Sequence, residues 1–330
     1  MTHNLAYLSS FQPLTLNDEE AVAEALGKAD VVTLIVGSAR ASRSSHLNPL
    51  SLPERIALLE RVYHSQLEAG RIAIATLSDQ LYDNAAWEAD LATLVEKLQI
   101  DGFVVRRDVK GKRERQLSRV APVHSCVADR MTQWRREEIF AGWYDGGPIP
   151  HLSLGTVSAL VDLRESKSFA WLKEEWQFHK GYRAAWAGTP YPVKFITADA
   201  CIECKGRVLL VRRGSWPGKG LWALPGGFLE NDETVDEAAA RELGEETNLD
   251  LTLEQAQEWL IRQGMFDLPY RDGRGRLVTG GYYFRVPGEV LPQVEASDDA
   301  DAVWWAPVDQ IQPEFMMADH FDIMRALRQA

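Results

Sequence analysis

The chain has 330 residues, which is too long for one ordinary domain and fits two domains of about 150 residues each. Hydrophobic residues make up 45% and charged residues 25%, so full cores can form and extensive disorder is excluded. The net charge of -12 disfavours nucleic acid and anionic membranes as partners. Three cysteines provide no disulfide framework, and we therefore expect a protein of the reducing cytoplasm.

The N-terminal sequence has no basic start followed by an apolar run and a small-residue cleavage site, so we expect no signal peptide. The longest apolar run, Val31 to Val36, is far shorter than the roughly 20 residues that span a bilayer. We therefore expect a protein that does not enter the membrane.

In the first half, short apolar runs alternate with helical patterns. The runs that predict strands are residues 5–9, 31–38, 71–78 and 102–105. The patterns that predict helices are residues 18–28, 53–68 and 84–98. Such alternation predicts βαβ units, and we expect an open, doubly wound α/β domain with a parallel sheet.

A basic segment follows, from Arg106 to Arg119, with seven basic residues in fourteen. A nucleic-acid patch is one interpretation, but the segment lacks interleaved aromatic residues and the rest of the chain is acidic. We expect a solvated loop instead, and no nucleic-acid partner.

Aromatic residues at helical spacing predict a helix from Ser168 to Trp186, and two prolines after it favour an extended strand. We place the domain boundary here, with domains at 1–187 and 188–330. Beyond it, two apolar runs predict a hairpin that turns at Lys205-Gly206, followed by one strong helix, further strands and a last helix from Ala318.

Three carboxylates of the strong helix stand out. Glu242, Glu245 and Glu246 fall on one face of its last turns, where they repel one another and meet the negative end of the helix dipole. A solvated acidic face is one interpretation. The other is a divalent cation, because Mg²⁺ binds hard oxygen ligands and would relieve the repulsion.

The spacing around these glutamates resembles the Nudix box, G-x5-E-x7-R-E-U-x-E-E-x-G-U, where U is aliphatic. The matching residues are Gly227, Glu233, Arg241, Glu242, Leu243, Glu245, Glu246 and Leu249. Asn248 replaces the second glycine, and asparagine is the other residue that best tolerates a positive φ. The second half is thus identified as similar to Nudix hydrolases, which implies an α/β/α sandwich that cleaves a nucleoside diphosphate linkage.

The resemblance implies a role for each residue of the box. Glu242, Glu245 and Glu246 would be the catalytic residues and would bind Mg²⁺ or Mn²⁺ together with the backbone carbonyl of Gly227. Glu233 and Arg241 would brace the loop against the helix. Water would attack a phosphorus atom, and one carboxylate would act as the base.

The segments around the box, such as PGKGLWALPGGFLE and FDLPYRDGRGR, resemble two-domain proteins that join nicotinamide mononucleotide adenylyltransferase to a Nudix hydrolase. In that family the Nudix half is similar to ADP-ribose pyrophosphatases, which release AMP and ribose 5-phosphate. Four arginines are candidate phosphate partners, because a guanidinium matches phosphate oxygens, although an exposed hairpin explains them equally well. They are Arg212, Arg213, Arg274 and Arg276.

The first half resembles the adenylyltransferase half of the same family, which implies a Rossmann-like nucleotidyltransferase fold. The family's G-R-F-x-P-x-[HT]-x-G-H loop aligns with residues 9–18, where Asp18 replaces the last histidine. A second phosphate motif, I-S-x-T-x-I-R, aligns with Leu152 to Ala159 without its arginine, and Arg164 comes too late. We expect that adenylyl transfer is lost, because a carboxylate repels phosphates.

The family's positions around the nicotinamide nucleotide are Gly37, Ser38, Asn48, Arg55 and Trp87. They either hold only the fold or retain nucleotide binding without chemistry. Two alternatives to a plain ADP-ribose hydrolase stay open: a bifunctional enzyme that also makes NAD, and an ADP-ribose-sensing regulator without turnover. The substrate among ADP-ribose, NADH and similar dinucleotides, and the choice between monomer and homodimer, stay open as well.

Overall fold

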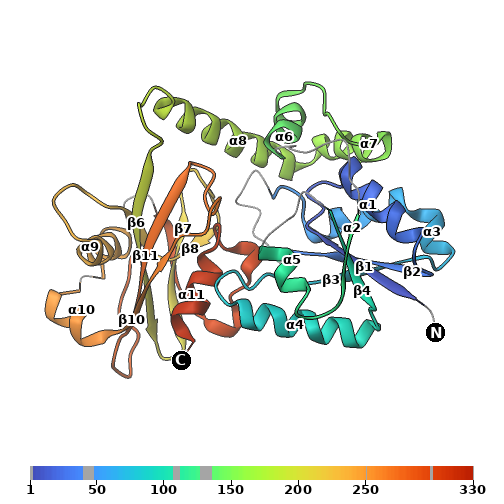
Figure 1. Cartoon of the computed structure of the whole chain (residues 1–330). Helices are drawn as coiled ribbons and strands as arrows, with labels where there is room; N and C mark the ends of the chain where they lie inside the picture. The colour runs from blue at the N-terminus through green and yellow to red at the C-terminus, as the bar shows by residue number, and fades with distance from the viewer. Residues whose placement is uncertain are drawn as a thin grey trace. The chain divides into compact units, whose positions relative to one another are not determined.

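The computed structural model describes residues 3–39, 48–106, 112–126, 136–249, 251–297 and 300–329. The chain divides into two compact units within helix α8 (Lys167–Trp186; Figure 1), and the division falls between Trp171 and Leu172. The domain boundary after residue 187 stays a prediction. No helix among the described residues is long and apolar enough to cross a membrane.

The first unit contains a five-stranded parallel sheet with the order β3-β2-β1-β4-β5. Its strands are β1 (Asn4–Ser9), β2 (Val31–Val36), β3 (Ile72–Thr76), β4 (Gly102–Arg106) and β5 (Val123–Cys126). The chain moves from β1 to β2 and β3 on one side, then returns to the other side of β1 with β4. The carboxyl ends of β1 and β4 therefore flank a topological switch point, where open α/β sheets bind ligands.

Helices cover both faces of this sheet. One face packs against α1 (Leu16–Leu26) and α2 (Leu52–Val62), followed by the short α3 (His64–Glu68). The other face packs against α4 (Asn84–Leu98) and α5 (Lys112–Leu117). Successive residues of a strand point to opposite faces of the sheet, so helices on both faces require apolar residues on both sides of the inner strands. The parallel sheet with helices on both faces confirms the predicted doubly wound domain.

Three details of the first unit differ from the sequence predictions, and one of them is that strand β5 was not predicted. The helix expected over 53–68 is two helices, because the chain breaks at Tyr63, which has φ -108° and ψ 22°. The basic segment is not a loop throughout, since residues 112–117 form α5 and Leu117 is buried against α4. Residues 107–111 of the basic segment lie outside the described residues.

Helices α6 (Arg136–Asp145) and α7 (Leu154–Asp162) and a 3-10 turn (Leu163–Glu165) follow the sheet. Their core is aromatic: Trp143 lies 5.0 Å from Tyr144 and 4.9 Å from Phe169 between ring centroids. Phe169 belongs to the first turn of α8, so this turn is packed into the first unit.

The second unit contains a mixed sheet with the order β10-β11-β6-β7-β12. Its main strands are β6 (Lys194–Cys204), β7 (Arg207–Arg213), β10 (Leu260–Phe266), β11 (Arg276–Arg285) and β12 (Ala300–Pro307). Two short strands extend it: β8 (Trp222–Ala223) pairs with β7, and β9 (Gly226–Phe228) pairs with β6. The predicted hairpin joins β6 to β7, with Lys205 at φ 52° and Gly206 at φ 70°, as a two-residue turn requires.

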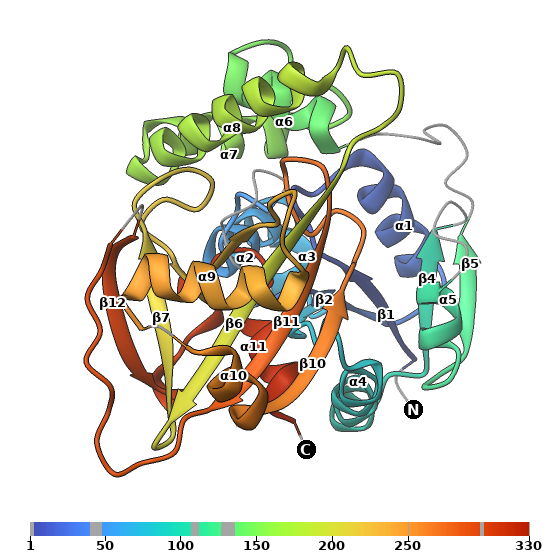
Figure 2. The ribbon, with the colours of Figure 1, turned by 90° about the vertical axis from the view of Figure 1, so that its left-hand side faces the viewer.

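Helices sandwich this sheet, as Figure 2 shows, with α9 (Val235–Thr247) in front and α11 (His320–Arg328) behind. The short helix α10 (Leu253–Trp259) lies on the α9 side and adds Trp259 to the core there. Two 3-10 turns (Val308–Gln310 and Pro313–Phe315) lead from β12 to α11. The predicted α/β/α sandwich is confirmed.

Candidate functional site

Helix α9 carries the candidate metal ligands, and local sequence fixes its ends. Thr234 is the N-cap, and its backbone N–H and hydroxyl both donate to Glu237, at 2.8 Å each. Asn248 ends the helix with φ 54°, in the left-handed conformation expected for the position where the family has glycine. The helix therefore ends at Thr247, directly after the last two glutamates of the box.

Glu246 is held at the junction between helix and sheet. Its side chain is 3% exposed, and its Oε2 accepts a hydrogen bond of 3.0 Å from the backbone N–H of Gly226. Gly226 belongs to β9 and pairs with Asp199 of β6. This bond therefore ties the end of α9 to the loop strand that precedes it.

Gly227 lies directly against Glu242. A β-carbon at position 227 would lie 2.2 Å from Oε1 and 2.6 Å from Oε2 of Glu242, closer than real Cβ contacts come. Only glycine allows the backbone of β9 to approach this carboxylate. The first glycine of the box is thus required by close approach rather than by an unusual φ.

Arg241 binds the carboxylates around it. Its guanidinium donates to both oxygens of Glu233, at 2.7 and 2.9 Å, to Glu242 at 3.0 Å and to Glu245 at 2.7 Å. It also donates to the carbonyl of Phe228 at 3.1 Å. The hydrogen bond from Arg241 lowers the pKa of Glu233, and the bond to Glu233 in turn raises the pKa of Arg241. Glu233 and Arg241 thus brace the loop against the helix.

The donor set fits a hard divalent cation. Glu242, Glu245 and Glu246 supply carboxylate oxygens from one helix face, and glycine at 227 brings a backbone segment within reach of Glu242. Within the described ranges, no three His, Cys, Asp or Glu side chains already surround one point as a metal site would. Arg241 balances Glu242 and Glu245 instead.

The four predicted substrate arginines do not form one cluster of free guanidinium groups. Arg213 donates to the carbonyl of Pro217, Arg274 is bound by Asp272, and Arg276 donates to the carbonyl of Asp267. Arg212 is exposed near the end of β7. Arg274 lies beside the box, with its guanidinium 5.0 Å from the ring centroid of Phe228. Substrate binding by these arginines stays a prediction.

A buried polar cluster on the α11 side of the sheet was not predicted from the sequence. Arg271 forms two hydrogen bonds with Asp319, of 2.8 and 2.9 Å, and both side chains are almost fully buried. His320 Nδ1 accepts from the backbone N–H of Leu224, and burial raises the pKa of Asp199 nearby. The signal in the sequence is Asp199, a carboxylate within the apolar residues 198–202 of β6.

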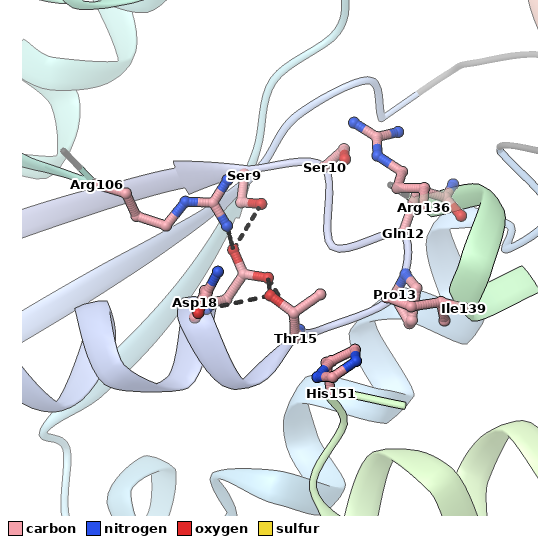
Figure 3. Close-up of a pocket in the computed structure, with 11 residues that line it drawn as sticks. Ser9, Ser10, Gln12, Pro13, Thr15, Asp18, Arg106, Arg136, Ile139 and His151 are labelled. Carbon is pink, nitrogen blue, oxygen red and sulfur yellow. Dashed lines mark hydrogen bonds and ion pairs between the residues drawn. The ribbon is translucent and has the colours of Figure 1, made fainter. Parts of the chain in front are cut away.

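A second candidate site is a pocket at the switch point of the first unit (Figure 3). It is lined from the carboxyl end of β1, from β4, and from the segments around α1, α6 and α7. The lining residues are Ser9, Ser10, Gln12, Pro13, Thr15, Asn17, Asp18, Arg106, Arg136, Ile139 and His151. Residues 9–18, which align with the family's phosphate loop, thus form much of the pocket wall.

Asp18 is a fully engaged structural carboxylate in this pocket. Its Oδ1 accepts from the hydroxyls of Tyr7 at 2.6 Å and Ser9 at 3.2 Å, and from Arg106 at 3.3 Å. Its Oδ2 accepts from the backbone N–H of Thr15 at 2.9 Å and from the Thr15 hydroxyl, which completes a capping box at the start of α1. Figure 3 shows Ser9, Thr15 and Arg106 converging on the carboxylate. The replacement of histidine is therefore accommodated by neighbours that all donate.

Arg55 holds the loops beside the pocket. It is 1% exposed and donates to the carbonyls of Ser10, Gly37 and Ser38 at 2.7 to 2.9 Å. Burial lowers its pKa to about 10. Trp87 belongs to α4 and is buried in the core between this helix and the sheet. The structure thus gives Arg55 and Trp87 clear roles in the fold, whereas nucleotide binding by these positions stays a prediction.

A protein-family model matches most of the second unit. Residues 195–327 match the model of the NUDIX domain, so this part of the chain is a Nudix domain. An ADP-ribose pyrophosphatase of Methanocaldococcus jannaschii is 39% identical over 105 residues, which are 32% of this chain and 57% of that protein. The ADPR responsive transcriptional repressor NtrR of Acinetobacter baylyi is 27% identical over 161 residues, 47% of this chain and 61% of the repressor. The chain thus spans less than two thirds of either relative.

A solved structure resembles the whole chain. A bifunctional NMN adenylyltransferase/ADP ribose pyrophosphatase from Francisella tularensis, complexed with AMP and a Mn ion, is 27% identical. The similarity covers 99% of this chain and 98% of that one, with a TM-score of 0.88. The resemblance of both halves to this two-domain family is confirmed.

Proposed function

We propose that the Nudix domain of this chain is a hydrolase that cleaves the diphosphate of ADP-ribose, or of a closely related nucleoside diphosphate, to AMP and ribose 5-phosphate. The observation that carries this proposal is the arrangement of Gly227, Glu242 and Glu246 at the junction of β9 and α9. The relative named ADP-ribose pyrophosphatase supports the choice of substrate.

The residues of the box would divide the work. Glu242, Glu245, Glu246 and the carbonyl of Gly227 would hold the cation, for which Mg²⁺ or Mn²⁺ is the natural choice with oxygen ligands. When bound, such a cation neutralises diphosphate charge and lowers the pKa of the attacking water. Glu246 keeps its orientation through Gly226, and Arg241 keeps Glu242 and Glu245 in place. Water would attack one phosphorus, and the P–O bond to the other phosphate would break.

Incubation of the full chain with Mg²⁺ and ADP-ribose tests the proposal. AMP should appear, and Glu246→Gln, which keeps the shape of the side chain, should lower the rate by roughly 100-fold or more. Glu254→Gln is the control, because it neutralises an exposed carboxylate on the neighbouring helix α10. Equal rates for the wild type and Glu246→Gln would show that the site is elsewhere.

A bifunctional enzyme is the second candidate, because the solved neighbour is named for both activities. Against it stands Asp18, whose carboxylate faces the pocket where the family places histidine. We propose that adenylyl transfer is lost and that the pocket, with Arg106 and Arg136 in its lining, keeps at most nucleotide binding. Incubation with ATP and nicotinamide mononucleotide decides between the two: appreciable NAD formation would show that the transferase is active.

A regulator without turnover is the third candidate, because one relative is named an ADPR responsive repressor. It predicts tight ADP-ribose binding in the presence of Mg²⁺ with no AMP release. It also predicts salt-dependent DNA binding that weakens when basic residues such as Arg115 and Arg119 are replaced. AMP release that depends on Glu246 would exclude it.

A further inference from the structure

Two ionisable residues are buried on the second half of α8, within the second unit. Glu175 and His179 are one helical turn apart and are 0% and 1% exposed, with 3.4 Å between Oε1 and Nε2. Burying such groups costs free energy unless other contacts repay it. An apolar pair would pack the helix without this desolvation cost. The neighbours of Glu175 and His179 therefore indicate what the two residues do.

His179 lies against the loop that joins β10 to β11, residues 267–275. A β-carbon at Gly273 would lie 2.7 Å from Cε1 and 2.8 Å from Nδ1 of the His179 ring. The loop backbone can therefore rest on the imidazole only because position 273 is glycine. This contact places the backbone of the loop directly against the His179 ring of α8.

The loop holds Arg274 in one orientation. Asp272 Oδ1 accepts from the backbone N–H of Arg274 at 2.8 Å and from its Nε at 3.0 Å, and Oδ2 accepts from Nη2 at 2.8 Å. Both side chains are largely buried. Although burial opposes ionisation of Asp272, Arg274 lowers the pKa of Asp272 to about 2, so the pair is ionised. The guanidinium lies over Phe228 as a result.

A second route leads from α8 to the same ring. Phe195 at the start of β6 packs edge-on against Tyr182 and Trp186 of α8, with centroid distances of 5.6 and 5.5 Å. On its other side Phe195 contacts Phe228 at 5.9 Å. Two independent sets of contacts thus connect α8 with Phe228, the residue that follows Gly227.

We propose that the second half of α8 is a positioning element of the hydrolase site. In this proposal His179, supported by Glu175, sets the 267–275 loop so that Arg274 holds Phe228, and with it the backbone of Gly227 against Glu242. The inference deepens the proposed function and rests on it for the identity of the site. It makes His179 a positioning residue for the cation-binding loop, although it belongs to a helix outside the Nudix box.

Hydrogen exchange and Mn²⁺ binding test the proposal on the full chain without substrate. His179→Leu keeps much of the volume but removes the imidazole from Gly273. It should speed amide exchange in the 226–228 segment and weaken Mn²⁺ binding by about 10-fold, the lower end of what loss of a group that orients metal ligands costs. His64→Leu, an exposed histidine on α3, and Gly181→Ala, at a helix position where a β-carbon meets nothing, are the controls.

A double-mutant cycle separates positioning from general packing. Phe228→Leu removes the shared ring at a half-exposed position and carries little risk to folding. If the contacts act through Phe228, His179→Leu should add less than 2-fold to the Mn²⁺ dissociation constant once Phe228→Leu is present. Full additivity would mean that His179 does not act through this ring.

The outcomes distinguish this inference from the proposed function. Exchange changes confined to residues 172–186 and 267–275, with Mn²⁺ affinity unchanged, would overturn the inference and leave the hydrolase intact. A wild-type chain that binds no Mn²⁺ and releases no AMP would overturn the proposed function. In that case the exchange of residues 226–228 in His179→Leu still decides whether α8 positions the loop.

Discussion

The backbone of Gly227 lies so close to the carboxylate of Glu242 that a β-carbon there would come within 2.2 Å of Oε1. The two residues are fifteen positions apart, and the contact closes the loop onto the helix. A methyl group could be accepted only if Glu242 or β9 moved. The position of one candidate ligand is thus coupled to the absence of a side chain on another.

Gly227→Ala should therefore lower Mg²⁺-dependent AMP release by roughly 100-fold, because a displacement of about 1 Å near the chemistry can cost that much. Its melting temperature should fall by only a few degrees, since the clash is with a side chain rather than with the core. Gly181→Ala provides the matched control and should keep wild-type hydrolysis. Unchanged hydrolysis in Gly227→Ala would mean that Glu242 does not need this position.

Chelation should abolish hydrolysis without unfolding the protein. The glutamates of the box already have partners in Arg241 and the N–H of Gly226, so the fold does not need the cation to offset their repulsion. Adding Mn²⁺ at 100 times its dissociation constant should stabilise the Nudix domain by about 2.7 kcal/mol. Calorimetry in EDTA and in Mn²⁺ measures both effects, and a loss of the folded state in EDTA would contradict the expectation.

Asp18→Asn should destabilise the first unit by about 3 kcal/mol. The amide cannot accept from Tyr7, Ser9, Thr15 and Arg106 together, and Arg106 loses its opposite charge. Glu20→Gln changes an exposed carboxylate on the same helix and should have almost no effect. Thermal unfolding of the two variants compares them, and equal melting temperatures would show that the Asp18 network contributes little.

Asp18→His restores the residue type that the family uses, but it should not restore NAD synthesis. The imidazole cannot accept from four neighbouring donors, and the second phosphate motif still lacks its arginine. NAD formation by Asp18→His, measured with ATP and nicotinamide mononucleotide, would show that one substitution alone had silenced the transferase.

The Glu175 and His179 pair should make stability depend on pH. Burial raises the pKa of Glu175 to about 9, so its contribution is complete below the unfolded pKa near 4.5 and is lost as pH rises toward 9. Burial lowers the pKa of His179 to about 4, so its contribution is complete above 6.5 and is lost as pH falls toward 4.

The two effects oppose each other between pH 4.5 and 6.5, and only that of Glu175 remains above this window. Unfolding free energy should then fall between pH 6.5 and 9, by at most about 1.4 kcal/mol per pH unit. Glu175→Gln should flatten this slope, whereas Glu174→Gln on the exposed side of α8 should keep it. A slope that persists in Glu175→Gln would assign it to other groups.

Local patterns in the sequence predicted much of the fold. The apolar runs predicted β1 to β4. The inner strands β1, β2 and β4 have buried residues on both faces and so read as nearly continuous apolar runs, whereas the edge strand β3 is partly exposed. The left-handed Asn248 and the Lys205-Gly206 turn were predicted because φ at such positions depends on the residue itself. The break at Tyr63 was not predicted, since no proline or glycine marks it.

The sequence by itself also determined the residues of the Nudix box, because their spacing along one helix is a local property. Only the tertiary structure decided that Glu246 is fastened by Gly226, that Asp18 is satisfied by donors from β1 and β4, and that His179 contacts a loop almost a hundred residues away. Such contacts depend on which faces pack together, and the periodicity that predicts a helix does not say which buried polar side chains will meet.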